Sequence, residues 1–138
     1  MGMVRIQWLP GGMTFIGTDS TNHSVVLSTP DENKGMKPSE LLLVAVGSCT
    51  AVDVVNILEK RRTPLSGLEI EVSGEQQQDP PWTFKKINIH YRLWGKNLTP
   101  KGVRMAIDLS EEKYCSVSAT VRGVAEISTS FEIGGIVD

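Results

Sequence analysis

The most restrictive feature of this sequence is a long helical segment whose first part is apolar on every side. Pro38 suits the first helical turn, Glu40 complements the positive end of the helix dipole, and Lys60-Arg61-Arg62 complements the negative end. We therefore expect a helix from Pro38 to about Arg62. Every residue from Leu41 to Val46 is apolar. A helix that is apolar all round lies inside a structure. One domain of this size could hardly bury it alone, which suggests a dimer.

The same helix is a poor candidate for a membrane span. Its longest apolar region, 41–58, is interrupted by Gly47, Ser48, Thr50, Asp53 and Asn56. The N-terminal residues lack the apolar core and small-residue site of a secretory signal. With 14 basic against 16 acidic residues, the net charge of −2 argues against binding nucleic acid or anionic membranes through global charge. We expect a soluble, cytoplasmic protein with reduced thiols and no nucleic-acid or membrane partner.

Shorter elements flank the long helix and define an α+β chain. Alternating apolar residues and turn signals predict three short strands before it, joined as a meander. The expected elements are strands at 3–9, 13–18 and 23–28, the long helix, strands at 68–73 and 86–93, helical pieces from 99 and at 111–122, and a last strand at 124–133. The two longer strands would set acids against bases across a hairpin. The 138 residues contain no repeat and no interdomain linker, so we expect one domain, 1–138.

The two cysteines are the main candidates for chemistry. Cys49 and Cys115 are 66 positions apart, and there is no CxxC pair and there are only two histidines, so zinc is not expected. Cys49 in an apolar helix can be a small core residue. Its small, partly polar neighbours, such as Ser48 and Thr50, can instead leave space and donors around the sulfur. Cys115 stands near a helix start, where amide groups can lower a thiol pKa, or it is ordinary packing.

Other polar residues give weaker signals. Glu40 is either a helix-dipole partner or a contributor at the thiol. Asp53 lies one turn after Cys49 as a solvated or hydrogen-bonded acid, and a structural role is favoured. His90 falls on the polar face of its strand, so we expect it to be exposed at the surface. No Ser–His–Asp spacing and no glycine-rich phosphate loop is present.

Two segments around the cysteines resemble the OsmC/Ohr family. The first covers Lys37–Leu43 and Val46–Val55, and the second combines Asp108-Leu109-Ser110 with Lys113–Val117. The predicted order of strands and helices agrees with that family across nearly the whole chain. The run Cys-x-Ala-x-Asp-Val-Val that starts at Cys49 is most similar to the YhfA-like branch.

The resemblance implies a thiol peroxidase that reduces organic hydroperoxides. It implies an OsmC-like fold in an intertwined homodimer, with the long helix at the centre and two sites at the subunit interface. By position, Cys49 would be the peroxidatic thiolate and Cys115 the resolving thiol. A dithiol, lipoyl groups in the hydroperoxide-resistance branch, would reduce the disulfide. No cofactor and no metal is implied.

The sequence departs from the hydroperoxide-resistance pattern at the residues that activate the thiol. Those members use an arginine from the N-terminal strands, and here no arginine lies between Arg5 and Arg61. Their glutamate directly follows the helix proline, whereas here Ser39 holds that place and Glu40 comes next. One residue turns a helix by about 100°.

Two functions therefore remain open. The first is a hydroperoxide reductase with site residues Cys49, Cys115 and Glu40. The alternative is an OsmC-like dimer with little peroxidase activity that binds a small apolar ligand at its interface. Other nucleophilic chemistry of Cys49 ranks last, because no general base has a suitable spacing.

Overall fold

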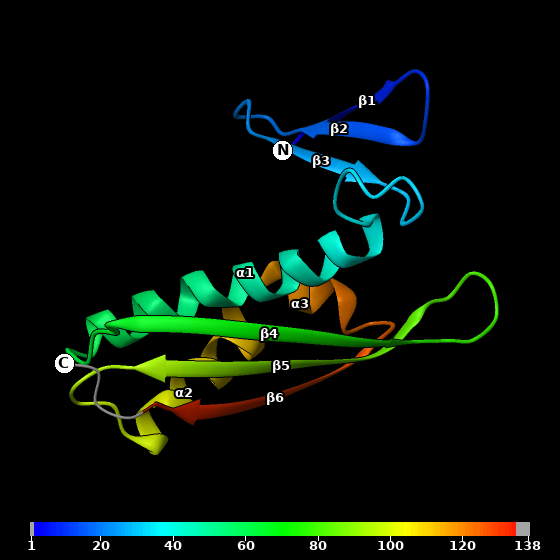
Figure 1. Cartoon of the computed structure of the whole chain (residues 1–138). Coiled ribbons are helices and arrows are strands. Elements are labelled where there is room, and N and C mark those ends of the chain that lie inside the picture. The colour runs from blue at the N-terminus through cyan, green and yellow to red at the C-terminus, as the bar shows by residue number, and fades with distance from the viewer. Residues whose placement is uncertain (1, 135–138) are drawn as a thin grey trace. The chain divides into compact units, whose positions relative to one another are not determined.

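The structure, a computed structural model, describes residues 2–134 and is drawn in Figure 1. The chain divides into two compact units, one up to Leu42 and one from Leu43 onward. The division lies inside a single long helix, α1 (Pro38–Lys60). Each unit is described by itself. The expectation of one domain over 1–138 stays a prediction.

The first unit contains the predicted meander. Its strands are β1 (Arg5–Leu9), β2 (Thr14–Thr18) and β3 (Ser24–Ser28), and they form an antiparallel sheet in the order β1-β2-β3. Gly11 has φ of 106° in the turn after β1, a conformation that an L side chain rarely adopts. β1 is exposed along its whole length, with Ile6 61% and Trp8 56% exposed. Its apolar side is thus left uncovered within this chain.

The second unit is a three-stranded sheet with helices on one face, as Figure 1 shows. Its elements after α1 are β4 (Gly67–Gln76), β5 (Phe84–Trp94), α2 (Pro100–Leu109), the π-helical segment η1 (Ser110–Tyr114), α3 (Ser116–Val121) and β6 (Glu126–Ile133). β4 and β5 form the predicted antiparallel hairpin, whereas β6 pairs with β5 in parallel. The helical segments between β5 and β6 supply the crossover that parallel pairing requires. The mixed α+β architecture predicted from the sequence is confirmed.

The core of this unit lies between β5 and the helices. From Ile87 to Leu93 every second residue of β5 is fully buried, in keeping with the two-residue period of a strand. The core residues from β5, α1 and α2 are Ile87, Ile89, Tyr91 and Leu93, then Val46, Val54 and Leu58, then Val103, Ala106 and Ile107. Each large apolar side chain buried here contributes about 1.5–3 kcal/mol.

Helix α1 buries only one of its sides in this chain. Val46 and Val54 are fully buried, whereas Val44 and Val52 on the other side are 48% and 61% exposed. By length and composition α1 could cross a membrane, and core helices pass the same test. Since one side of α1 packs in the core of the second unit, α1 is a core helix. Its other apolar side is exposed in this chain.

Gly47 lets α1 approach the sheet closely. A Cβ built on Gly47 would lie 2.8 Å from Cγ2 of Val72 in β4, closer than real Cβ contacts come. Glycine therefore brings the turn of α1 that carries Cys49 up against the sheet. The predicted N-cap of α2 is also present, with the Gly102 N–H donating to Thr99 Oγ1 at 3.0 Å.

The outer face of the sheet carries the predicted pairing of acids and bases. Arg92 Nη1 lies 3.0 Å from Glu69 and 2.9 Å from Glu71 across the hairpin. Its Nε donates to Glu132 Oε1 on β6 at 2.6 Å. The hydrogen bond from Arg92, and after it the one from His90, lowers the pKa of Glu132. One arginine thus links all three strands.

The expected single helical piece at 111–122 is wrong in one respect. η1 ends at Tyr114, and Cys115 has φ −81° and ψ 101°, an extended conformation, before α3 begins. Cys115 therefore lies between two helical segments and not within one. The break turns its side chain into the core, where it is 2% exposed.

Candidate dithiol site

The two cysteines are neighbours in the second unit although they are far apart in the sequence. Cys49 lies in the middle of α1, and Cys115 lies between η1 and α3. Both are free thiols. Burial raises the pKa of the Cys115 thiol, and the adjacent Cys49 thiol raises it further. The fold thus places in one site the two thiols that the sequence analysis singled out.

Cys115 is the N-cap residue of α3. Burial has the largest effect on the pKa of its thiol. Its Sγ accepts a hydrogen bond from the Ser118 N–H at 3.4 Å. That hydrogen bond lowers the thiol pKa, as expected near a helix start, but desolvation is the larger cause and acts in the opposite direction. The net shift is upward, so Cys115 is a neutral thiol at pH 7.

Cys49 is only partly buried and is the more accessible of the two thiols. The Ser48 hydroxyl donates to the Val44 carbonyl at 2.7 Å, so this neighbour is engaged with the helix backbone. Thr50, on the other side of Cys49 in the chain, is fully buried and points into the polar network described next. Of the small polar neighbours noted in the sequence, Thr50 is the one that contributes to the site.

A chain of hydrogen bonds runs through the core beside the thiols. Tyr91 Oη lies 2.8 Å from Thr50 Oγ1, which lies 2.9 Å from Ser110 Oγ. The Ser110 hydroxyl donates to Asp53 Oδ2 at 2.8 Å. Tyr91, Thr50 and Ser110 are fully buried, and Asp53 is partly exposed. We call these four residues the hydroxyl chain. Asp53 is therefore hydrogen-bonded, as one of the two sequence interpretations had it.

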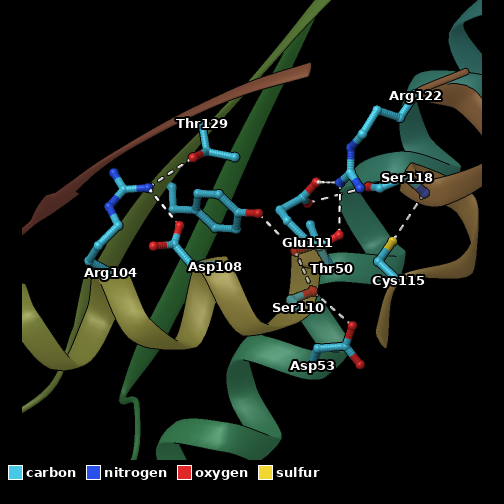
Figure 2. A network of polar contacts seen from close by, with 11 residues as sticks. Thr50, Asp53, Arg104, Asp108, Ser110, Glu111, Cys115, Ser118, Arg122 and Thr129 are labelled. Carbon is cyan, nitrogen blue, oxygen red and sulfur yellow. Dashed lines mark hydrogen bonds and ion pairs between the residues drawn. The ribbon is translucent and has the colours of Figure 1, made fainter. Parts of the chain in front are cut away.

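An ion pair with a nearly buried carboxylate lies on the Cys115 side of the site. Figure 2 shows Glu111, Arg122 and Ser118 grouped beside Cys115. Arg122 Nη2 donates to Glu111 Oε2 at 3.0 Å and to the Glu111 carbonyl at 2.8 Å. The Ser118 hydroxyl donates to Glu111 Oε1 at 3.3 Å. The Glu111 side chain is 10% exposed and that of Arg122 43%, so the cation reaches from solvent to a buried carboxylate.

Glu40 belongs to the first unit and pairs with Lys37 there. Glu40 Oε1 lies 3.2 Å from Lys37 Nζ, and both side chains are about half exposed. Its assignment as a site residue stays a prediction. His90, expected on the surface, is partly buried and hydrogen-bonds Ser130 Oγ through Nδ1 at 2.7 Å.

Several residues of the site were not assigned a role from the sequence, although Ser110 lies in the second family motif. Tyr91 and Ser110 come from a core strand and the start of η1, and Glu111 and Arg122 from η1 and the end of α3. Only the contact between elements gives them a common role. Among residues 2–134, no group of three His, Cys, Asp or Glu side chains is placed to hold a metal ion.

A pocket of about 410 Å³ opens beside the outer end of the hydroxyl chain. Asp53 lies in its wall with the cations Lys60 and Arg61, and Tyr114 and Leu109 complete that side. Leu109 and Tyr114 flank the segment that carries Ser110. The hydroxyl chain therefore connects this opening with the buried Tyr91.

The fold and the adjoining thiols define an α+β dithiol protein. The family model described as "OsmC-like protein" matches residues 31–130, and the chain belongs to that family. It is 35% identical over 129 residues to Protein YhfA of Escherichia coli strain K12, an alignment that covers 94% of this chain and 96% of that protein.

Solved structures agree with this membership. A hypothetical protein from Aquifex aeolicus VF5 is 32% identical, with a TM-score of 0.86 over 97% of this chain and 96% of the other. The organic hydroperoxide resistance protein OhrB of Bacillus subtilis is 17% identical, with a TM-score of 0.66 over 96% of this chain and 98% of the other. The second likeness shows a shared fold.

Proposed function

We propose that this protein is a thiol-dependent hydroperoxide reductase that cycles Cys49 and Cys115 between dithiol and disulfide. The observation that carries the proposal is the placement of two free thiols side by side from separate elements of one unit. The name of the similar OhrB fold, an organic hydroperoxide resistance protein, gives the substrate class. YhfA, the more similar relative, carries a name without an activity.

In the first step Cys49 attacks the peroxide. Cys49, on helix α1, is the less buried of the two thiols, so it is the one that a small substrate reaches first. Its thiolate attacks the terminal oxygen of the hydroperoxide. The S–O bond of Cys49 sulfenic acid forms, the O–O bond breaks, and the alkoxide takes up one proton to leave as the alcohol. The sulfur loses two electrons and the O–O bond gains them.

In the second step Cys115 resolves the sulfenic acid. Its sulfur bonds to Cys49 and displaces hydroxide, which takes the Cys115 proton and leaves as water. The raised pKa of Cys115, caused first by burial, keeps that proton on the sulfur until this step. An external dithiol, of the lipoyl type, then reduces the disulfide by exchange and becomes a disulfide itself.

We further propose that the working form is a cytoplasmic homodimer. The uncovered side of α1 is apolar and includes Val44, Val52 and Val55. The β1 strand of the other unit also exposes Ile6 and Trp8. Large exposed apolar surfaces of this kind mark interaction sites. A second copy of the chain is the partner, because a helix apolar on both sides then lies at the centre of the assembly.

Turnover with cumene hydroperoxide and dihydrolipoamide tests the proposed activity. We expect peroxide consumption by the native protein, none by Cys49→Ser, and a single turnover by Cys115→Ser, whose sulfenic acid lacks its resolving partner. Ser116→Ala, at an exposed residue next to Cys115, is the matched control and keeps full activity. No peroxide consumption by native protein would refute the proposal.

The second candidate function is the binding of a small apolar ligand. A hollow of about 380 Å³ in the first unit is lined by apolar residues that include Val4, Ile6, Val25 and Leu27. Native mass spectrometry of the purified protein, together with the peroxide assay, distinguishes ligand binding from hydroperoxide reduction. A bound apolar molecule in a protein that does not consume peroxide would favour this candidate.

A further inference from the structure

The pocket of about 410 Å³ lies between one face of α1 and the segment that runs from α2 into η1. Its residues on α1 recur at the spacing of a single helix face, and they are Asp53, Asn56, Ile57, Lys60 and Arg61. The opposite wall is formed by Met105, Leu109 and Tyr114. Neither cysteine is among the lining residues. The pocket is therefore separate from the dithiol and has the size of a small-molecule site.

One end of the pocket carries an excess of positive charge. Lys60 and Arg61 line this end, and among the residues that the structure describes neither has an acid side chain as an ion-pair partner. The Arg61 guanidinium instead donates to the thioether sulfur of Met105 at 3.5 Å, and sulfur is a weak acceptor. The negative end of the α1 dipole offsets only about half of one charge. Two cations beside an opening, with so little counter-charge, favour an anionic ligand.

The start of α2 adds to the positive end of the pocket. Arg61 packs against the first turn of α2, because a Cβ built on Gly102 would lie 3.7 Å from Nη2 of Arg61. That turn contains Lys101 and no acidic residue. Peptide dipoles place about half a positive charge at a helix N-terminus, which repels a nearby guanidinium. An anion bound by Arg61 at this point would be attracted by the guanidinium and by the helix dipole.

The other end of the pocket offers a hydrogen-bond acceptor. Asp53 lies two turns before Lys60, about 10 Å away along the axis of α1. Figure 2 shows Ser110 bonded to Asp53, and its hydroxyl donates to Oδ2 at 2.8 Å, which holds the carboxylate in place. No donor among the described residues bonds to Oδ1 of Asp53, so this oxygen is available to a ligand. Ile57 and Met105 make the wall between the two ends apolar.

We propose that this pocket binds a small bipolar acid, with its carboxylate at Lys60 and Arg61 and a hydrogen-bond donor, such as an ammonium or hydroxyl group, at Asp53. An apolar stretch of about 10 Å joins the two groups, matching the two helical turns between the charges. The reverse orientation would place one carboxylate against another. A purely apolar ligand would desolvate the charged ends without pairing them. The site is independent of the thiol chemistry of the proposed function.

Calorimetric titration of the native protein at low salt with three straight-chain probes tests the polarity of the site. The probes are 8-aminooctanoate, octanoate and octylamine, which carry both end groups, the acid alone and the amine alone. We expect 8-aminooctanoate to bind most tightly. Octanoate should bind about fivefold more weakly, the size expected for the loss of one ion pair open to solvent. Octylamine should show no saturable binding, because the cation end of the pocket repels it.

Two variants assign the ends of the bound molecule. Arg61→Gln, at an exposed position, should raise the Kd of both acids about fivefold. Asp53→Asn should raise the Kd of 8-aminooctanoate by about the same factor but not that of octanoate, which loses a repulsion instead. Lys86→Gln, at an exposed cation on the outer side of the sheet, is the matched control and should change neither Kd. Should Asp53→Asn fail to fold, Arg61→Gln and the three probes still decide.

The outcomes separate this site from the proposed function, because binding is measured without peroxide. Octylamine that binds as tightly as octanoate would overturn the proposal, and so would acids that bind Arg61→Gln as tightly as the native protein. An equal loss in Lys86→Gln would also overturn it, since the probes would then respond to net charge alone. A protein that reduces hydroperoxides but binds none of the probes would refute this site and leave the reductase standing. The expected binding pattern in a protein inert to peroxide would uphold the site and refute the reductase.

Discussion

At the residue scale, the ion pair of Glu111 and Arg122 holds a nearly buried carboxylate beside Cys115. The carboxylate is nearly buried, and its two oxygens are satisfied by the Arg122 guanidinium and the Ser118 hydroxyl. A buried charge is tolerated only while such partners remain. The pair also joins η1 to α3 across the break at Cys115, so it holds the segment that carries this thiol.

Removing the cation alone should therefore be costly. We expect Arg122→Met to destabilise the protein by about 2 kcal/mol, less than for a fully buried pair because the guanidinium is partly exposed. Equilibrium denaturation in urea measures this. The double variant Glu111→Gln with Arg122→Met should lose less than the single variant, because no unpaired charge is left. A double variant less stable than Arg122→Met alone would contradict this account.

The sequence indicated the two thiols but not the hydroxyl chain beside them. Cys49 and Cys115 stand out because cysteine is rare in the chain and each lies in a family motif. In the sequence Tyr91 is one more residue on the apolar face of a strand, and Ser110 lies in the second family motif without an assigned role. Their hydrogen bonds to Thr50 join residues 41 and 60 positions apart. Pattern and propensity are local and do not record such contacts.

At the scale of elements, the sequence predicted where α1 ends but not the backbone conformation that ends it. The basic residues at 60–62 predicted the helix end, and α1 does end at Lys60. Arg62, however, has φ of 64°, and the Thr63 N–H bonds back to the Leu58 carbonyl at 2.9 Å. This is the left-handed closing turn that glycine usually supplies. The sequence analysis treated Arg62 only as a positive charge at the end of the helix dipole. It therefore did not predict the left-handed backbone conformation of this residue.

Replacing that arginine should stabilise the helix end. We expect Arg62→Gly to raise the free energy of unfolding by about 0.5–1 kcal/mol, because a Cβ disfavours the left-handed conformation. Thermal and urea unfolding of the variant and the native protein both measure this difference in the free energy of unfolding. Lys60→Gly, two residues earlier and inside the helix, is the matched control and should destabilise by about 1 kcal/mol. Equal destabilisation by both would show that the turn does not constrain residue 62.

The parallel pairing of β6 with β5 is the other element that the sequence left open. The strand at 126–133 was expected from its alternation, but alternation is the same for parallel and antiparallel neighbours. Direction is decided by the crossover through α2, η1 and α3, which must carry Ser110 and Cys115 back over the sheet. The fold class was predictable, and the route that builds the site was not.

At the scale of the whole molecule, a single chain buries only one of the two apolar sides of α1. Val46, Val54 and Leu58 are buried in the second unit, while Val44, Val52 and Val55 are exposed. The amount of apolar surface was evident from the sequence. Its division into a buried and an uncovered face required the structure.

A charge placed on the uncovered face should separate the proposed dimer. We expect Val52→Glu to convert a dimer into a folded monomer at micromolar concentration, because a buried unpaired carboxylate would oppose association. Light scattering after gel filtration gives the mass, and circular dichroism confirms folding. Lys86→Glu, on the exposed outer side of the sheet, is the charge control and should leave the dimer intact. A monomeric native protein would contradict the dimer.

The central claim, that Cys49 and Cys115 act as one dithiol, is tested most directly by mapping thiols after one equivalent of cumene hydroperoxide per chain. Peptide mass spectrometry under non-reducing conditions locates the bond that forms. The account predicts a Cys49–Cys115 disulfide within one chain, with the loss of two hydrogens, and its reversal by a dithiol. Two thiols that stay free, or a disulfide that forms only between chains, would contradict it.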